Sequence, residues 1–319
     1  MHPASSVGEL TIAKRTLVMG IVNVTKDSFS DGGRWLDFDA ATTHARELVE
    51  QGADMIDVGG ESTRPGAVRV EAQEEADRVV PVIQALHEQG IRTSVDTMRA
   101  SVATAAAEAG VDMINDVSGG LADPEMYAAM ADAGVPVCLM HWRTLQEGAF
   151  GSAAGTADHG GDVVRDVHET LARLSQNALD AGVKKDNIVL DPGLGFAKSP
   201  QDNWALLKAL PEFLDGEFPI LVGASRKRFL AAIREDRGVE ASPLLADPAT
   251  AAVTAISAQM GAWGVRVHEV GVSRDAVDVA AAWNAGKSYV GGANATGSYR
   301  NAATGTGSVT STAMGTERN

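Results

Sequence analysis

The feature that most constrains this chain is a short apolar segment ending in a polar or glycine residue, repeated eight times. In residues 188–191, three bulky residues precede Asp191 and a glycine-rich turn. A short apolar run bounded by turn residues is typical of a strand covered on both faces, as in parallel sheets. The other segments are 17–22 before Asn23, 55–56 before Asp57, 93–95 before Asp96, 113–114 before Asn115, 137–140 before His141, 220–222 before Gly223, and 264–265 before Arg266.

Alanine-rich, charged stretches separate these segments, for example at 38–51, 72–89, 100–109, 124–133, 162–181 and 249–260. Such composition favours amphipathic crossover helices. Eight strand–helix units predict a closed (β/α)8 TIM barrel, in which the polar residues after the strands meet at one mouth. An open doubly wound sheet would also alternate, but no GxGxxG motif follows the first strand.

Length and charge agree with a barrel. The chain has 319 residues, and a barrel of this kind needs about 250, so one domain and a tail suffice. The net charge of −15 argues against a nucleic-acid partner, which would need a clustered basic surface. The lone cysteine, Cys138, lies inside an apolar segment and is interpreted as a buried hydrophobic residue. No apolar run is long enough to span a membrane and no signal sequence is evident, so we expect a cytoplasmic protein with no membrane partner.

Several segments are expected to lie outside the strand–helix core. We predict a barrel domain over residues 1–287 and a disordered, low-complexity tail over residues 288–319, because that tail has almost no apolar bulk. The first dozen residues precede the barrel or cover its lower end. The loops 24–33 and 59–67 are predicted to be mobile lids, and the glycine- and alanine-rich stretch 144–161 a surface excursion.

The polar segment ends are embedded in longer motifs that resemble those of the dihydropteroate synthase family. These motifs are MGIVNVTKDSFSDGG (19–33), DVGGESTRPG (57–66), SVDT (94–97), IND (114–116), DPGLGF (191–196), GASRK (223–227) and RVH (266–268). They occur in order on successive predicted strand ends, from residue 17 to residue 283. The resemblance implies a folate-biosynthesis transferase and sulfonamide target. It would join 6-hydroxymethyl-7,8-dihydropterin diphosphate to 4-aminobenzoate, with Mg²⁺ as cofactor, and act as a homodimer.

A pterin can be recognised by side chains at four of the predicted strand ends. Its flat edge alternates N–H, amine and carbonyl groups, so it needs carboxylates for the donors and an amide or ammonium for the acceptors. Asp96, Asn115, Asp191 and Lys227 supply both kinds. The resemblance assigns these residues to the pterin, with Met140 and Phe196 packing on the ring and Arg266 stacking over it.

The diphosphate requires cations and a metal ion. Arg266 and His268 are two residues apart on the last strand, so their side chains are expected to point the same way, with Asn23 facing them from the adjacent first strand. The resemblance assigns Asn23 to Mg²⁺ and the diphosphate, and Arg64, Arg266 and His268 to the phosphate oxygens. One direct protein ligand suits Mg²⁺, which keeps several waters.

The remaining assignments concern 4-aminobenzoate and the reaction. Phe29, Thr63 and Pro65 are expected to frame its ring, and its carboxylate to lie at the N-terminus of a helix that begins near Lys227. Ser225 is a candidate donor there. Many family members carry serine where this chain has Arg228, so that residue either assists or faces solvent. The catalytic set is Asp31, Asn23, Lys227, Arg266 and His268, with Asp31 stabilising a pterin-methyl cation in an SN1-like displacement.

Three other functions remain open at this point. A pterin-dependent methyltransferase domain would share the barrel and the Asp–Asn–Asp set but not the phosphate-binding cations. A catalytically silent, pterin-binding paralogue would be expected to have lost loop residues, which are intact here. A barrel hydrolase acting on another phosphate ester would be distinguished by its product.

Overall fold

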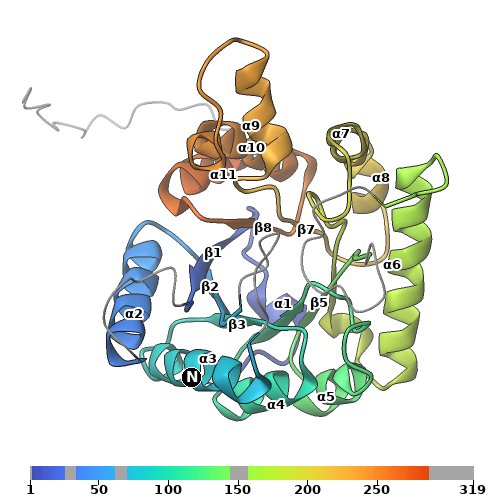
Figure 1. The fold of residues 1–319 in the computed structure, drawn as a ribbon. Coiled ribbons are helices and arrows are strands. Elements are labelled where there is room, and N and C mark those ends of the chain that lie inside the picture. Colours follow the sequence, from blue (N-terminus) through green and yellow to red (C-terminus); the bar gives the residue numbers. More distant parts are fainter. Residues whose placement is uncertain (1, 26–33, 62–69, 144–156, 287–319) are drawn as a thin grey trace, which may run out of the picture. The chain divides into compact units, whose positions relative to one another are not determined.

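Eight parallel strands lie at the centre of the molecule within a ring of helices (Figure 1). The structure is a computed structural model and describes residues 2–25, 34–61, 70–143 and 157–286. Its strands are β1 (Leu17–Asn23), β2 (Met55–Gly59), β3 (Thr93–Asp96), β4 (Met113–Asp116), β5 (Val137–Met140), β6 (Ile188–Asp191), β7 (Leu221–Val222) and β8 (Gly264–Val267).

The helices follow the strands in alternation, as the sequence predicts. They are α1 (Val7–Leu10), α2 (Arg34–Glu50), α3 (Ala72–Glu88), α4 (Ala100–Glu108), α5 (Met126–Ala133), α6 (Val163–Asp180), α7 (Pro200–Lys208), α8 (Leu210–Leu214), α9 (Arg228–Glu235), α10 (Asp247–Met260) and α11 (Val270–Asn284). Short 3-10 helices lie at η1 (Lys185–Asn187) and η2 (Pro243–Ala246). The predicted tail, residues 288–319, lies outside the described residues.

The strand order is β6-β5-β4-β3-β2-β1-β8-β7, and every pair is parallel. The two end strands meet through a single bridge between Leu190 and Ile220, so the barrel is nearly closed and has its weakest seam between β6 and β7. The predicted (β/α)8 barrel is therefore confirmed.

Alternation along the strands separates two apolar layers. Val18, Ile56 and Val95 belong to the large core cluster that packs the sheet against the helices. Their strand neighbours point into the barrel, where Leu17, Met19, Met55, Met113 and Cys138 form its lower filling. Each such fully buried side chain contributes about 1.5–3 kcal/mol.

The N-terminal segment closes the lower end of this filling. Ala4, Val7 and Leu10 join the inner apolar cluster and are almost fully buried. The sequence left open whether the first dozen residues precede the barrel or cover its lower end. The second alternative is the observed one, because α1 provides an apolar face for an otherwise open barrel floor.

Local signals fix the starts of the two helices that flank the mouth near β6. The Asp162 side chain accepts the Arg165 N–H at the start of α6. Ser199 and Asp202 form a capping box at the start of α7. Such caps satisfy backbone donors that the first helical turn leaves unpaired.

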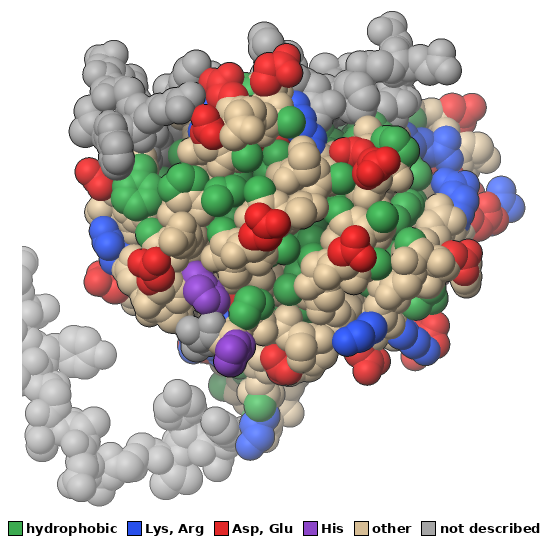
Figure 2. All heavy atoms as spheres, turned by 90° about the horizontal axis from the view of Figure 1, so that it is seen from below, with side chains coloured by type: hydrophobic (Ala, Val, Ile, Leu, Met, Phe, Trp, Pro, Cys, Tyr) green, Lys and Arg blue, Asp and Glu red, His purple; other side chains and the backbone are tan. Residues whose placement is uncertain are grey.

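The outer face at the lower side of Figure 1, formed by α3 to α5, is seen in Figure 2. On its described surface, acidic and basic side chains are interspersed with apolar ones. None of the described helices is both long enough and apolar enough to cross a membrane.

Candidate functional site

The top layer of the barrel interior is polar because of strand alternation. In β3, Ser94 and Asp96 point inward while Val95 points outward to the helices. The same two-residue period directs four side chains of other strands toward the mouth, namely Asn115 of β4, Met140 of β5, Asp191 of β6 and Arg266 of β8. The structure therefore brings together the predicted set Asp96, Asn115, Met140, Asp191, Phe196, Lys227 and Arg266.

Arg266 lies at the centre of this layer, between two carboxylates. Its Nε donates to Asp57 Oδ2 at 2.6 Å, and its Nη2 donates to Asp96 Oδ2 at 2.6 Å. Asn115 Nδ2 donates to the same Asp57 oxygen at 3.1 Å, which leaves the amide oxygen of Asn115 to accept from a ligand. Arg266 was assigned to stacking on the pterin and to phosphate, and in this structure it makes these two ion pairs.

Asp57 was missed as a site residue. Its side chain is fully buried, and among the described residues its Oδ1 has no hydrogen-bond partner. The signal that could have found it is the strand period, because Asp57 follows Met55 by two residues and must share its inward direction. It connects two predicted binding residues, Arg266 and Asn115.

Asp191 is followed by a turn that needs glycine at two positions. Gly193 has φ +72°, and a Cβ there would lie 2.2 Å from the His141 carbonyl oxygen. Gly195 has φ +78°, and a Cβ there would lie 2.6 Å from Lys227 Cδ. The close approach that requires glycine at position 195 is made by the protein's own Lys227, whose Nζ lies 4.0 Å from the centre of the Phe196 ring.

An apolar wall completes the mouth on the side of β5 and β6. Met140 and Phe196 pack with Met98, Val117 and Trp142 in a small buried cluster. Sequence reasoning missed the last three because they follow β3, β4 and β5 rather than lying within apolar runs. Such a wall can cover one face of a flat ring.

Burial dominates the electrostatics of the mouth. Burial raises the pKa of Asp96 to about 7, helped by Asp57 and opposed by Arg266, because two carboxylates share one guanidinium. Burial also raises the pKa of Asp191, against the Gly193 N–H and Lys227, and lowers the pKa of Lys227 to about 8. Because burial disfavours the charged forms of these groups, a ligand that hydrogen-bonds to them would stabilise those forms.

The start of α9 lies beside β8. The Ser225 hydroxyl lies 3.0 Å from His268 Nδ1, and its oxygen accepts the His268 N–H at 3.1 Å. Lys227 is the residue before α9 and makes no side-chain cap, while Arg228 is exposed. The hydroxyl can donate to Nδ1 of a neutral ring, and in that tautomer Nε2 carries the ring hydrogen.

Asn23 does not face Arg266 as the sequence analysis expected. The register pairs Met19 with Arg266, whereas Asn23 pairs with Gly59 of β2. The two strands are adjacent as expected, but a parallel register cannot be counted from sequence alone. A Cβ on Gly59 would lie 3.4 Å from Asn23 Oδ1 and 3.6 Å from Asp96 Cβ, so the amide oxygen reaches over the acidic layer.

The other predicted site residues are Phe29, Asp31, Thr63, Arg64 and Pro65. All five lie outside the described residues, as do most of the two predicted lids.

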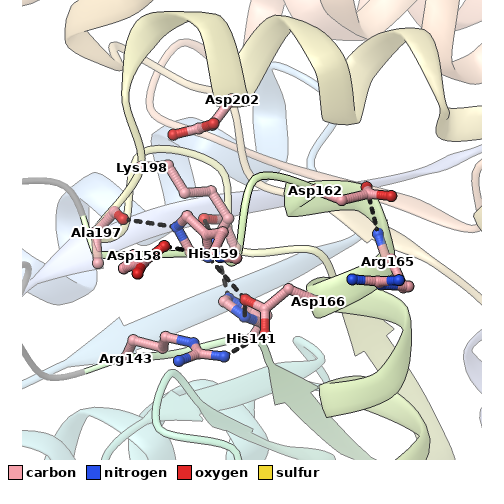
Figure 3. Close-up of polar contacts among 12 residues, drawn as sticks. His141, Arg143, Asp158, His159, Asp162, Arg165, Asp166, Ala197, Lys198 and Asp202 are labelled. Carbon is pink, nitrogen blue, oxygen red and sulfur yellow. Dashed lines mark hydrogen bonds and ion pairs between the residues drawn. The ribbon is translucent and has the colours of Figure 1, made fainter.

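A second polar cluster, which sequence reasoning missed, lies next to the Phe196 turn (Figure 3). His141, His159 and Asp166 place one ligand atom each within 4.8 Å of one another. Lys198 Nζ donates to His141 Nδ1 at 2.9 Å and to the Gly193 carbonyl at 2.9 Å. Burial and Lys198 lower the pKa of His141 to about 3, and burial lowers the pKa of Lys198 to about 7.

This cluster qualifies one prediction. The stretch 144–161 was interpreted as a surface excursion, and residues 144–156 lie outside the described part of the chain. In its described end Asp158, Gly160 and Gly161 are exposed, but His159 is 8% exposed and bonded on both ring nitrogens. The composition of the stretch does not indicate the burial of His159, because one histidine hardly changes the average composition of a glycine- and alanine-rich segment.

Comparison with known proteins identifies the family of this chain. The family described as pterin binding enzyme matches residues 19–268. A dihydropteroate synthase of Mycobacterium leprae is 49% identical over 267 residues, which cover 83% of this chain and 93% of that relative. The Xanthomonas albilineans dihydropteroate synthase solved with 4-aminobenzoic acid has a TM-score of 0.75 at 44% identity, covering 85% of this chain and 93% of that one. Its complex with 7,8-dihydropteroate has a TM-score of 0.72 at 40% identity, with coverage of 85% and 93%.

Proposed function

This chain belongs to the family of pterin binding enzymes, as a transferase of the dihydropteroate synthase type, and from that premise we propose how its barrel mouth works. The site takes 6-hydroxymethyl-7,8-dihydropterin diphosphate and 4-aminobenzoate and releases 7,8-dihydropteroate and pyrophosphate. The observation that carries this proposal is the set of buried Asp96, Asn115 and Asp191 with half-buried Lys227 beside the Phe196 ring.

The pterin is read by complementary hydrogen bonds. Asp96 and Asp191 accept from its ring N–H and amine groups, and Lys227 donates to its carbonyl. Asn115 accepts through its amide oxygen, because Asp57 already takes its N–H group at 3.1 Å. Phe196 covers one face of the ring. In a site removed from water, each bond discriminates strongly against a ligand that cannot make it.

The diphosphate is bound by Asn23 at the end of β1 and by side chains that follow or belong to β2 and β8. His268 donates through Nε2, and Arg266 and Arg64 supply positive charge. Arg266 can turn to phosphate only if the pterin takes over the acceptors that now hold it, Asp57 and Asp96. Substrate binding is therefore coupled to rearrangement of this ion-pair network.

Asn23 is the proposed protein ligand of Mg²⁺. Its amide oxygen reaches over Gly59 at the mouth, and oxygen is the donor type that Mg²⁺ prefers. A single neutral ligand fits an ion that keeps waters and shares the diphosphate oxygens. When bound, Mg²⁺ would neutralise charge on the leaving group.

The carboxylate of 4-aminobenzoate lies at the start of α9. Lys227 makes no side-chain cap there, so the first backbone N–H groups of that helix can donate to an anion. Ser225 is engaged with His268 and contributes through that contact. Arg228 is exposed, and we assign it to the rim of this subsite. Phe29, Thr63 and Pro65 frame the ring.

The reaction needs no enzymic nucleophile. The bond between the pterin methylene carbon and the diphosphate oxygen breaks first, and both electrons leave with pyrophosphate. The electron-rich dihydropterin delocalises the resulting cation, and the carboxylate of Asp31 stabilises it. The amine nitrogen of 4-aminobenzoate then bonds to the methylene carbon and releases a proton to solvent.

Binding follows a compulsory order, with the pterin diphosphate first. The 4-aminobenzoate ring is framed by two glycine-rich polar loops, which the diphosphate of the bound pterin would hold closed by offering negative charge to Arg64. Pyrophosphate with Mg²⁺ should substitute in this role. Calorimetric titration of 4-aminobenzoate into the free protein tests the order, and micromolar binding without either partner contradicts it.

A homodimer accounts for the apolar face of α10 and α11. Ile256, Met260, Val279 and Trp283 are large, apolar and 46–75% exposed on these neighbouring helices. Exposed apolar side chains gathered in this way mark association surfaces. Replacement of Ile256 and Val279 by glutamate should give a monomer in analytical ultracentrifugation, and an unchanged sedimentation coefficient contradicts this interface.

The decisive experiment incubates the purified chain with both substrates and Mg²⁺ and measures pyrophosphate and 7,8-dihydropteroate together. Both products should appear in equal amounts. Asp191→Asn is the matched control, since it changes one buried atom of the pterin site. A silent paralogue would bind the pterin without forming either product, and a methyltransferase would release no pyrophosphate.

A further inference from the structure

The turn that carries Phe196 has a strained backbone. Gly193 and Gly195 have positive φ, and so does Ala197, at +51°. Glycine adopts this left-handed region freely, but alanine does so only when its surroundings hold it there. The position of the Phe196 ring therefore depends on whatever fixes Ala197.

The Ala197 carbonyl is held by the chain segment that follows the excursion after β5. It accepts the Ala157 N–H at 2.9 Å and the ring Nε2–H of His159 at 3.0 Å. His159 is buried, and Figure 3 shows its ring between Ala197 and Asp166.

Asp166, in the first turn of α6, fixes the His159 ring from its other side. Its Oδ2 lies 2.7 Å from His159 Nδ1, and its Oδ1 accepts from Arg143. A carbonyl can only accept a hydrogen bond, so His159 Nε2 must carry a hydrogen.

The same three side chains could be considered as metal ligands, because His141 Nε2 and His159 Nδ1 both face Asp166 Oδ2, at 3.4 and 2.7 Å, and His141 Nε2 has no hydrogen-bond partner among the described residues. The other nitrogen of each ring is engaged. His159 Nε2 is bonded to Ala197. The lone pair of His141 Nδ1 accepts from Lys198, which also donates to Phe196 and Gly193. Lys198 and Arg143 supply positive charge on both sides of the cluster, which disfavours a further cation. The contacts converge on the turn, not on an ion.

We propose that His159 is a positioning residue for pterin recognition, acting through the Ala197 carbonyl on the Phe196 ring. This inference rests on the proposed function, in which Phe196 covers the pterin. Asp166 orients His159, and Lys198 holds the rest of the turn through the Phe196 and Gly193 carbonyls. His159 touches no substrate in this scheme.

The first test replaces His159 by leucine, which fills similar space without a donor. The dissociation constant for pterin diphosphate, measured by calorimetry, should rise about fivefold, as expected for one lost hydrogen bond. The KM for pterin diphosphate should rise in parallel while kcat stays within about twofold. His168→Leu is the matched control, because His168 lies on α6 but stacks on Phe213 at 3.9 Å. Its pterin affinity should be unchanged.

The second test separates positioning from general destabilisation. Suppose that His159 acts by holding Ala197 in the left-handed region. Pterin affinity should then depend less on His159 in the Ala197→Gly variant, because glycine adopts that region unaided. His159→Leu should therefore raise the pterin dissociation constant less in the Ala197→Gly background than in the parent. Equal effects in both backgrounds would overturn the inference.

A rescue variant and a binding control complete the experiment. His159→Gln keeps a donor toward Ala197 and should recover at least part of the affinity. A loss of affinity equal to that of His159→Leu would overturn the donor role.

Thermal unfolding of each variant identifies any that fails to fold. If His159→Leu fails to fold, the pterin affinities of His159→Gln and Ala197→Gly test the inference. If the parent binds no pterin, the proposed function fails and this inference fails with it. If the parent binds and His159→Leu binds equally well, only this inference is overturned.

Discussion

The two ends of the barrel both contain arginine–aspartate pairs, but the pairs are built differently. At the amino-terminal end of the strands, Asp112 accepts from Arg92 and from the backbone N–H groups of Ala4 and Thr93. At the carboxyl-terminal end, Arg266 is shared by Asp57 and Asp96, and Asp57 Oδ1 has no partner among the described residues.

The difference shows how one chemistry serves two purposes. Where each carboxylate oxygen is filled by donors of the chain itself, the pair stabilises the fold and offers nothing to a ligand. Where two carboxylates share one guanidinium, some carboxylate oxygens have no donor. Burial of such a group of side chains costs free energy, and these oxygens can accept hydrogen bonds from a ligand. The polar groups at the lower end are paired within the chain, whereas those at the upper end can pair with a substrate.

The largest expected effect is at the lower end. Asp112→Ala leaves Arg92 and two backbone donors without their acceptor, so we expect the free energy of unfolding to fall by about 3 kcal/mol. Pterin affinity of the folded fraction should not change. Urea denaturation measures the first and calorimetry the second, with the exposed Asp132→Ala as control. A selective loss of pterin binding would show that the two ends are not separate in role.

The reverse pattern is expected at the upper end. Asp191→Asn removes a charged acceptor of the pterin and should weaken pterin binding at least about tenfold. The free energy of unfolding should stay the same or rise, because burial raises the pKa of Asp191 and so disfavours the ionised form. Asp96→Ala should weaken binding likewise. Unchanged affinity in both variants would contradict the assignment of the pterin site.

The pH dependence of binding sharpens the same comparison. Burial raises the pKa of Asp96 to about 7 and lowers that of Lys227 to about 8, so affinity for the pterin should be highest between these values. A decrease of about threefold is expected from pH ~7.5 to pH ~6.5, as Asp96 takes up its proton. Calorimetry across this range measures it, and Asp96→Asn should lose the acidic decrease.

Stability should follow pH in the opposite sense. Folded Asp96 has a higher pKa than unfolded Asp96, so the folded state binds more protons between pH ~4 and pH ~7. The contribution of Asp96 to stability therefore falls as pH rises through this range and is constant above it. The difference in unfolding free energy between the parent and Asp96→Asn should show this slope. A flat difference would mean that Arg266 offsets the burial fully.

The smallest effect is expected from removing the chain after Tyr289. A cavity of about 390 Å³ lies at the amino-terminal end of the strands, lined in part by Arg15, Trp263 and Asn284. The deleted segment has almost no apolar bulk with which to fill it, so the melting temperature and turnover should hardly change. A decrease of several degrees would show that the lower end is completed by the tail.

The fold could be predicted from sequence because its signals are local and repeated. Each strand has its own apolar run, so Ile188–Asp191 and its seven counterparts identify the barrel without knowledge of any long-range contact. The same runs led to Asp96, Asn115 and Asp191, since each stands at a strand end. Cys138 was recognised as buried for this reason, and the structure confirms it.

The rest of the site depends on register and on contacts between distant segments. The pairing of Asn23 with Gly59, and not with Arg266, follows from how two strands slide against each other. The contact of His159 with Ala197 joins residues 38 positions apart through a segment of uninformative composition. Asp57 follows its apolar run as the other polar residues do, but its role comes from contacts with Arg266 and Asn115 on two other strands, which the sequence does not show.

The burial of Cys138 also has a practical consequence. This thiol is the single cysteine of the chain, it is fully buried in β5, and burial raises its pKa well above the usual range. Thiol-directed reagents react through the thiolate, so the native protein should be inert toward them. A fluorophore or spin label attached to a cysteine introduced at an exposed position would then report on that position alone, without first removing any native residue.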